Sequence, residues 1–179
     1  MLDQAGVAFA VEGPDVDEAA AKRRYSDARQ LATALAEAKA VAVGKARPGD
    51  LIIGSDSVVS VDGKLFDKPR DRDQAAEHLR AFSGKTMILT SAVALARDGA
   101  IEWSVCDIAT LKVRTLSPEF IEGYLDAEWP EVGYCVGVFR LEGLGVQLFE
   151  RMEGDYFSIL GMPLLPLLGA LRDRKVIMS

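Results

Sequence analysis

Apolar and polar positions along the chain predict a mixture of strands and helices. Three long apolar runs favour strands with a buried face, and they cover residues 51–61, 86–96 and 101–114. Leu31 and Leu35 recur at helical spacing with small apolar residues, which predicts a helix over 27–45 that follows the N-cap Ser26. The pattern therefore predicts both strands and helices in this chain.

Turn and capping signals divide the rest of the chain. The segment 97–100 separates the second and third apolar runs, which are therefore expected to form an antiparallel pair at the centre of the sheet. The other expected elements are short strands over 7–11 and 146–151, a hairpin turn at Asp62-Gly63, and helices from Asp71 or Asp73 to about Phe82, over 118–126, and from Gly161-Met162-Pro163 to about Arg172. No repeat or interdomain linker interrupts this order.

A single carboxylate lies inside the first apolar run. The sequence passes from Gly54-Ser55 through Asp56 and returns at once to Val58-Val59. Burying an unpaired charge costs several kcal/mol or shifts its pKa, so Asp56 is expected to have a partner: a metal ion, an arginine or lysine, or a set of backbone donors. The alternative is an aspartate at an edge or bulge that caps a turn. The hairpin that follows brings Lys68 and Arg70 back toward this strand.

Composition narrows the function mainly by exclusion. The 179 residues are 49% hydrophobic and 27% charged, as in an ordinary globular domain. A net charge of −6 argues against binding to nucleic-acid polymers or anionic membranes. No apolar run approaches the roughly 20 residues that cross a bilayer, so a cytoplasmic protein is expected. With one histidine, and with Cys106 and Cys135 far apart, histidine or thiolate metal sites and Ser-His-Asp triads have little support.

Several charged residues stand in unusually apolar or glycine-rich contexts, and these form the candidate site: Glu18, Lys39, Asp56, Lys68, Arg70 and Glu142. Carboxylates with lysines suit Mg²⁺ and phosphate chemistry, and a carboxylate near such a metal can accept a proton from an attacking water. Each residue also has a plainer interpretation, such as a solvated acidic turn for Glu18 or a solvated helical lysine for Lys39. These residues alone rank an enzyme only slightly above a non-catalytic anion-binding module.

Five short motifs stand in an order and spacing that resembles the Maf family. They are Leu35-Ala36-Glu37-Ala38-Lys39-Ala40, Gly54-Ser55-Asp56-Ser57-Val58-Val59, Lys68-Pro69-Arg70, Glu142-Gly143-Leu144-Gly145 and Gly161-Met162-Pro163-Leu164. The resemblance covers essentially the whole chain. Members of this family are nucleoside triphosphate pyrophosphatases, related in fold to the inosine triphosphate pyrophosphatases.

The resemblance implies an elongated α/β fold in which a twisted mixed sheet is flanked by helices and two lobes surround a cleft. It implies hydrolysis of a nucleoside triphosphate between the α and β phosphates, with Mg²⁺ or Mn²⁺, and a homodimer. Asp56 matches the family's proton acceptor, and Glu18 matches an acid associated with the metal and the catalytic water, so both are expected at the metal. Lys39 and Lys68 match lysines that contact phosphate, and Arg70 is expected to join them in binding the substrate.

Glu142 stands where many members of the family carry glutamine. Together with the segments 139–143 and 148–154, it is more similar to the branch that acts on 7-methyl-GTP, where a carboxylate could accept hydrogen bonds from a guanine edge; the dTTP/UTP branch is the alternative. Members also begin with a Ser-x-Ser-Pro-Arg-Arg type loop, and residues 1–7 correspond to the helix after it. The chain is therefore expected to be a single Maf-like domain truncated at the N-terminus, or else a non-catalytic nucleotide-binding or division-regulating protein.

Overall fold

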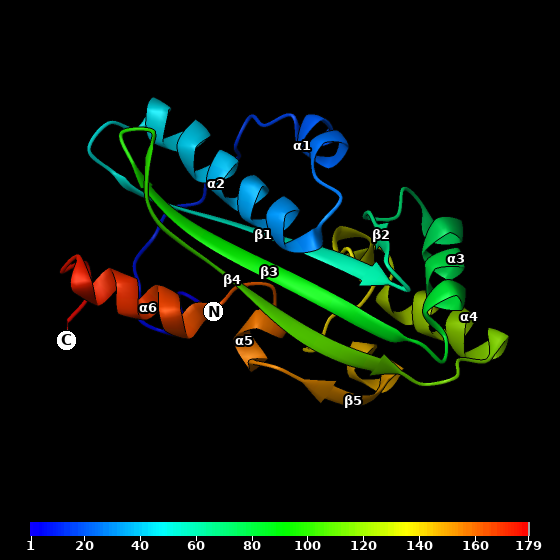
Figure 1. Ribbon diagram of the computed structural model, residues 1–179. Helices are drawn as coiled ribbons and strands as arrows, with labels where there is room; N and C mark the ends of the chain where they lie inside the picture. Colours follow the sequence, from blue (N-terminus) through cyan, green and yellow to red (C-terminus); the bar gives the residue numbers. More distant parts are fainter. Residues whose placement is uncertain (179) are drawn as a thin grey trace. The chain divides into compact units, whose positions relative to one another are not determined.

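The computed structural model describes residues 1–178 and contains a five-stranded sheet with helices packed on it (Figure 1). The strands are β1 (Leu51–Val61), β2 (Lys64–Phe66), β3 (Thr86–Arg97), β4 (Ala100–Val113) and β5 (Phe149–Glu153). The helices are α1 (Glu18–Arg24), α2 (Ala28–Ala46), α3 (Arg72–Phe82), α4 (Pro118–Glu128), α5 (Tyr156–Ile159) and α6 (Leu164–Asp173), with 3₁₀ helices η1 (Glu131–Tyr134) and η2 (Leu144–Leu148). The predicted α/β class is confirmed.

The sheet has the strand order β2-β1-β3-β4-β5, so the two long apolar segments β3 and β4 are inner strands as predicted. β1 pairs antiparallel with β2, with Val59 opposite Phe66, and β4 pairs antiparallel with β5, with Thr110 opposite Glu153. Figure 1 shows β1 and β3 running in opposite directions, and a turn at Asp98-Gly99 reverses the chain between β3 and β4. The resemblance implied a mixed sheet; each neighbouring pair here is antiparallel instead.

Capping residues account for where the helices begin. The carboxylate of Asp27 accepts a hydrogen bond from the N–H of Gln30, which makes Asp27 the N-cap of α2 in place of the expected Ser26. The same arrangement recurs at α3, where Asp71 rather than Asp73 is the cap. Ser117 caps α4, whose first residue is a proline, as the sequence predicts.

Two predicted strands differ from the structure. The segment 7–11 forms no strand, because Val7 folds back to the carbonyl of Leu2 in a turn and Val11 remains 88% exposed. The strand predicted over 146–151 begins later, as β5 at Phe149, because residues 144–148 form the 3₁₀ helix η2. The short helix α5 was not predicted, since four residues carry too little periodicity to identify.

The described chain divides into two compact units. The first contains Met1–Ser57, Thr90–Asp107 and the C-terminal residues from Asp155, and the second contains Val58–Leu89 and Ile108–Gly154. β1, β3 and β4 each contribute residues to both units.

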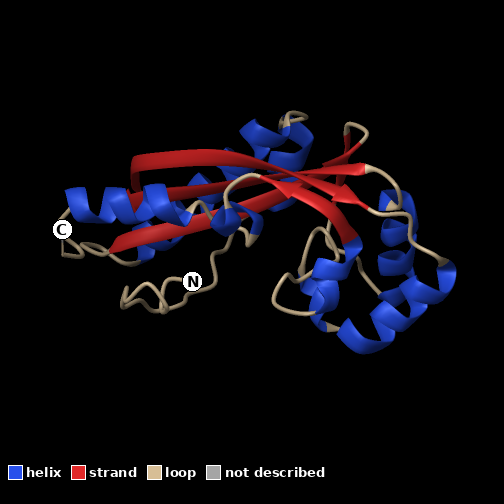
Figure 2. Cartoon of the chain, turned by 90° about the horizontal axis from the view of Figure 1, so that it is seen from below, coloured by secondary structure: helices blue, strands red, loops and turns tan. Residues whose placement is uncertain are grey.

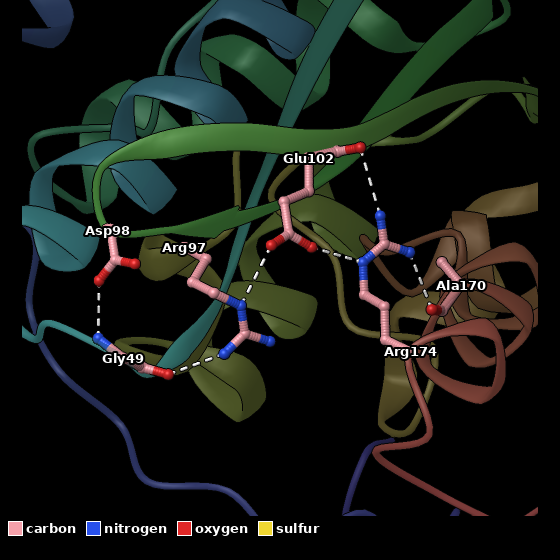
Figure 3. Close-up of polar contacts among 6 residues, drawn as sticks. All are labelled: Gly49, Arg97, Asp98, Glu102, Ala170 and Arg174. Carbon is pink, nitrogen blue, oxygen red and sulfur yellow. Dashed lines mark hydrogen bonds and ion pairs between the residues drawn. The ribbon is translucent and has the colours of Figure 1, made fainter.

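The first unit buries an apolar cluster beneath α6. Its fully or nearly buried members are Val7, Val93, Leu95, Met162, Leu164, Leu167, Ala170 and Leu171. The last turn of this helix is tied to β4 by Arg174, whose guanidinium binds the Glu102 side chain and backbone (Figure 3). Arg97 binds the other oxygen of the same carboxylate.

The second unit packs α3 against α4, which lie side by side (Figure 2). Leu79 and Phe82 of α3 are buried, as are Ile121 and Leu125 of α4. No helix in the described part of the chain is both long and apolar enough to cross a membrane.

Candidate functional site

Asp56 lies in the middle of β1 and has the partner that its position predicts. Lys39, on α2, donates from Nζ to Asp56 Oδ1 at 2.5 Å. The same ammonium forms an ion pair with Glu18 Oε1, at 2.8 Å, from the first residue of α1. The side chains of Asp56 and Lys39 are only 13% and 21% exposed. Three of the six predicted site residues, taken from three separate elements of the first unit, therefore meet at one nitrogen atom.

Gly54 explains why Lys39 can reach β1. Alternate residues of a strand share a face, so Gly54 and Asp56 both face α2, which lies along β1 (Figure 1). A Cβ atom at Gly54 would lie 2.2 Å from the carbonyl oxygen of Ala36 and 2.6 Å from the nitrogen of Ala40. Because Gly54 has no side chain, the backbone of α2 can contact β1 at Ala36 and Ala40, which lie before and after Lys39 in the sequence.

Two serines hold the opposite face of β1. Ser55 and Ser57 both donate to the carbonyl oxygen of Gly161, at 3.2 and 3.1 Å. Ser55 also donates to the carbonyl of Ala92 at 2.9 Å, and Ser57 exchanges a hydrogen bond of 2.9 Å with Ser91. The residues that flank Asp56 are thus fixed on the face of the strand that Asp56 does not use.

The sequence motif contains Ser55 and Ser57 but did not predict that they fix the strand that carries Asp56. Strand alternation was the available signal, since it separates residues 55 and 57 from residue 56. Their partner could not be read from the sequence, because Gly161 lies more than a hundred residues away. Gly161 has φ +106°, a conformation that favours glycine.

Glu18 reaches Lys39 from a short, exposed helix. α1 has only seven residues, and each of them is at least partly exposed. Its start is set by Asp17, whose side chain accepts the N–H of Ala20 at 3.0 Å. The plainer interpretation of Glu18 as a solvated acid in a turn therefore gives way to a carboxylate that shares Lys39 with Asp56.

The electrostatics of this cluster keep Lys39 charged. Burial acts to lower the pKa of Lys39, but the hydrogen bonds from its ammonium to Asp56 and Glu18, and the charges of those two acids, outweigh burial and raise the pKa above the ordinary value of 10.5. One ammonium therefore binds two acidic side chains, from α1 and β1. Among the described residues, no group of three or more histidine, cysteine, aspartate or glutamate side chains is placed to hold a metal ion.

The other three predicted residues belong to the second unit, and all are exposed. Arg70 donates from its backbone N–H and from Nε to Gln74 Oε1, at 2.9 and 3.2 Å, so the start of α3 orients it. The charges of Lys68 and Glu142 both affect the pKa of the half-buried Cys135 thiol. Burial raises this pKa, the positive charge of Lys68 lowers it, and the negative charge of Glu142 raises it further. Lys68 and Glu142 are thus electrostatic neighbours of one thiol within this unit.

Comparisons with known proteins match nearly the whole chain. The family model described as Maf-like protein matches residues 1–174. A nucleoside triphosphate pyrophosphatase of Paramagnetospirillum magneticum is 46% identical over 177 residues, covering 97% of this chain and 91% of that protein. Two proteins named 7-methyl-GTP pyrophosphatase, from Rhizobium etli and Brucella suis, are 44% and 42% identical over 177 and 181 residues. The matches cover 97% and 99% of this chain, and 89% and 91% of the two relatives.

Proposed function

The chain belongs to the Maf family, and from this premise we propose that it hydrolyses nucleoside triphosphates to the monophosphate and pyrophosphate. The observation that carries the proposal is the Glu18–Lys39–Asp56 cluster in the first unit. Relatives 42–46% identical to the chain are named nucleoside triphosphate pyrophosphatase or 7-methyl-GTP pyrophosphatase. Such a nucleotide-metabolising role suits a cytoplasmic protein, and the homodimer that the family resemblance implies remains a prediction.

In the proposed reaction, Asp56 is the general base. A water oxygen forms a bond to the α-phosphorus, the bond from that phosphorus to the bridging oxygen breaks, and pyrophosphate leaves with the electron pair. The proton of the attacking water passes to Asp56. Lys39 holds the carboxylate in place through the 2.5 Å hydrogen bond, and its ammonium remains available to phosphate oxygens as a compact positive charge.

We further propose that Asp56 and Glu18 hold a divalent cation, Mg²⁺ or Mn²⁺. Mg²⁺ in proteins is usually bound by one or two carboxylates, and water and substrate phosphates complete its shell. The two carboxylates fit that description, because both lie within 2.8 Å of the Lys39 nitrogen and are therefore close enough together to share a metal ion beside the ammonium. When bound, the metal would neutralise charge on the phosphates.

For the substrate we favour a guanine nucleotide, 7-methyl-GTP in particular, over dTTP or UTP. A guanine edge presents two neighbouring N–H donors, and the carboxylate of Glu142 is acceptor-only when ionised, so the two are complementary. Two of the relatives named above, at 44% and 42% identity, are 7-methyl-GTP pyrophosphatases by name. We propose that Lys68 and Arg70 contact the substrate's phosphates.

The test is pyrophosphate release from a panel of 7-methyl-GTP, GTP, dTTP and UTP, with Mg²⁺ or Mn²⁺ and with a chelator in place of the metal. Asp56→Asn is expected to lower kcat by about 10²–10⁴-fold, because the amide cannot accept the proton, while the circular dichroism spectrum stays unchanged. Glu37→Gln is the matched control, since Glu37 lies on the same helix and hydrogen-bonds to Ser104 instead of Lys39.

Three outcomes would count against the proposal. An Asp56→Asn variant with wild-type turnover would remove Asp56 from the reaction. Turnover that a chelator leaves unchanged would exclude the metal. Nucleotide binding by calorimetry without any pyrophosphate release would favour a non-catalytic nucleotide-binding protein.

A further inference from the structure

The loop that carries Glu142 is held by two side chains of α4. The hydroxyl of Tyr124 donates to the carbonyl oxygen of Val138 at 3.0 Å, and Tyr124 is only 3% exposed. The carboxylate of Glu128 accepts the N–H of Leu144 at 2.9 Å through Oε1. The two contacts lie on either side of Glu142 in the sequence, and all of these residues belong to the second unit.

The spacing of the two side chains makes them a pair. Residues 124 and 128 are one helical turn apart, so their side chains project from the same face of α4. Glu122 and Asp126 lie on nearly the opposite face, about 200° away by helix geometry. Both of these acids bind Arg72 of α3, at 2.8 and 2.6 Å. One face of α4 is therefore fixed to α3 while the other face holds the loop.

The loop backbone is shaped around the Glu128 carboxylate. A Cβ atom at Gly143, the residue directly after Glu142, would lie 2.6 Å from Glu128 Oε1 and 2.8 Å from Oε2. A Cβ atom at Gly145 would lie 2.3 Å from the carbonyl oxygen of Arg140. Glycine at position 143 therefore leaves room for the Glu128 carboxylate, and glycine at position 145 leaves room for the Arg140 backbone.

Strain in the backbone also points to a loop held for a purpose. Val138 has φ +54°, which is a marked outlier for a β-branched residue. Such a conformation persists only where the surroundings impose it, and Tyr124 binds the carbonyl of this same residue.

We propose that Glu128 is a positioning residue for nucleotide binding, with Tyr124 as a second anchor: it fixes the Gly143-Leu144 backbone and thereby orients Glu142 toward the substrate. The inference rests on the proposed function, because Glu142 is the residue expected to contact the nucleotide. Neither Glu128 nor Tyr124 needs to touch the substrate. Their effect passes through the loop.

Glu128→Ala is expected to raise the KM for the nucleotide about tenfold with kcat within twofold of wild type, the signature of lost binding in ground and transition states alike. Glu128→Gln should restore most of the affinity, because its amide oxygen can still accept the Leu144 N–H. In a Glu142→Ala background, Glu128→Ala should add little, because residues that act through one contact are not additive. Equal KM effects in both backgrounds would overturn the inference.

A second measurement separates this inference from the proposed function. Hydrogen exchange of the amides in segment 140–146 should accelerate in Glu128→Ala and stay near wild type in Glu128→Gln, whether or not the chain turns over a nucleotide. Unchanged exchange in Glu128→Ala overturns the positioning role, and a wild-type chain without turnover overturns the proposed function. Tyr124→Phe, which removes only the hydroxyl, provides the same comparison if Glu128→Ala does not fold, with faster exchange expected around residue 138.

Discussion

Gly54→Ala gives the sharpest test of how the site is built. The added methyl would lie 2.2 Å from the carbonyl oxygen of Ala36, whereas ordinary contact begins near 3.4 Å, so α2 has to move away from β1 by about 1 Å. Overpacking of this kind costs about 1–3 kcal/mol, and alanine recovers about 0.4–1 kcal/mol by restricting the unfolded chain. The net loss of about 1–2 kcal/mol should lower the Tm by about 2–8 °C.

The same movement of α2 should also lower the catalytic rate. Lys39 is on the part of α2 that moves, while Asp56 stays on β1, so their hydrogen bond lengthens. A misplacement of about 1 Å can cost up to about 10²-fold in rate, and we expect kcat/KM for pyrophosphate release to fall about 10–100-fold.

Gly169→Ala is the control for this variant. Gly169 lies in α6, where a Cβ atom would have no neighbour within 4 Å. That substitution should stabilise the protein by about 0.5–1 kcal/mol and leave turnover unchanged. A Gly54→Ala variant with wild-type Tm and wild-type kcat/KM would refute the argument that close backbone contact delivers Lys39 to Asp56.

Two further predictions concern stability. Burial lowers the pKa of His78 below 6.5, and its Nδ1 has no partner among the described residues, so the unfolded chain binds a proton more readily and stability should fall as pH falls through 6.5. Differential scanning calorimetry from pH 7.5 to 5.5 should show a smaller loss of Tm for His78→Leu; an equal loss would assign the effect to other groups. Arg174→Met removes the hydrogen bonds to Glu102 and to the carbonyl of Ala170 and should lower the Tm by about 2–4 °C, with Arg174→Lys intermediate (Figure 3). Unchanged melting of Arg174→Met would show that this network contributes nothing.

Local pattern predicts elements in both units. The helical repeat around Leu31 and Leu35 correctly predicts α2, and the Asp62-Gly63 turn correctly predicts the β1–β2 hairpin, because both signals lie within a few residues of the element they specify. The position of Asp56 among apolar residues predicts a charged partner, and Lys39 is that partner. A buried carboxylate in a strand has few other solutions.

What the sequence did not predict depends on distant contacts. The apolar segment 7–11 has strand-like composition, but it is largely exposed and pairs with no strand; Phe9, for instance, is 52% exposed. Residues 144–148 form a 3₁₀ helix, so β5 starts later than its apolar pattern suggests. The role inferred for Glu128 was equally hidden, since its partner Leu144 is sixteen residues away in a glycine-rich loop with no periodicity.

The Gly54-Ser55-Asp56-Ser57 segment specifies its own register in the first unit. The even positions face α2, where glycine permits close contact and the aspartate meets Lys39; the odd positions face Gly161, whose carbonyl accepts from both serines. A slip of one residue would exchange the two faces. The Asp56 carboxylate would then face the Gly161 carbonyl, two acceptors without a proton between them, and Lys39 would face a serine. The alternation of side chains that places Asp56 beside Lys39 therefore also disfavours pairing shifted by one residue. This short strand segment thus fixes the position of the proposed general base.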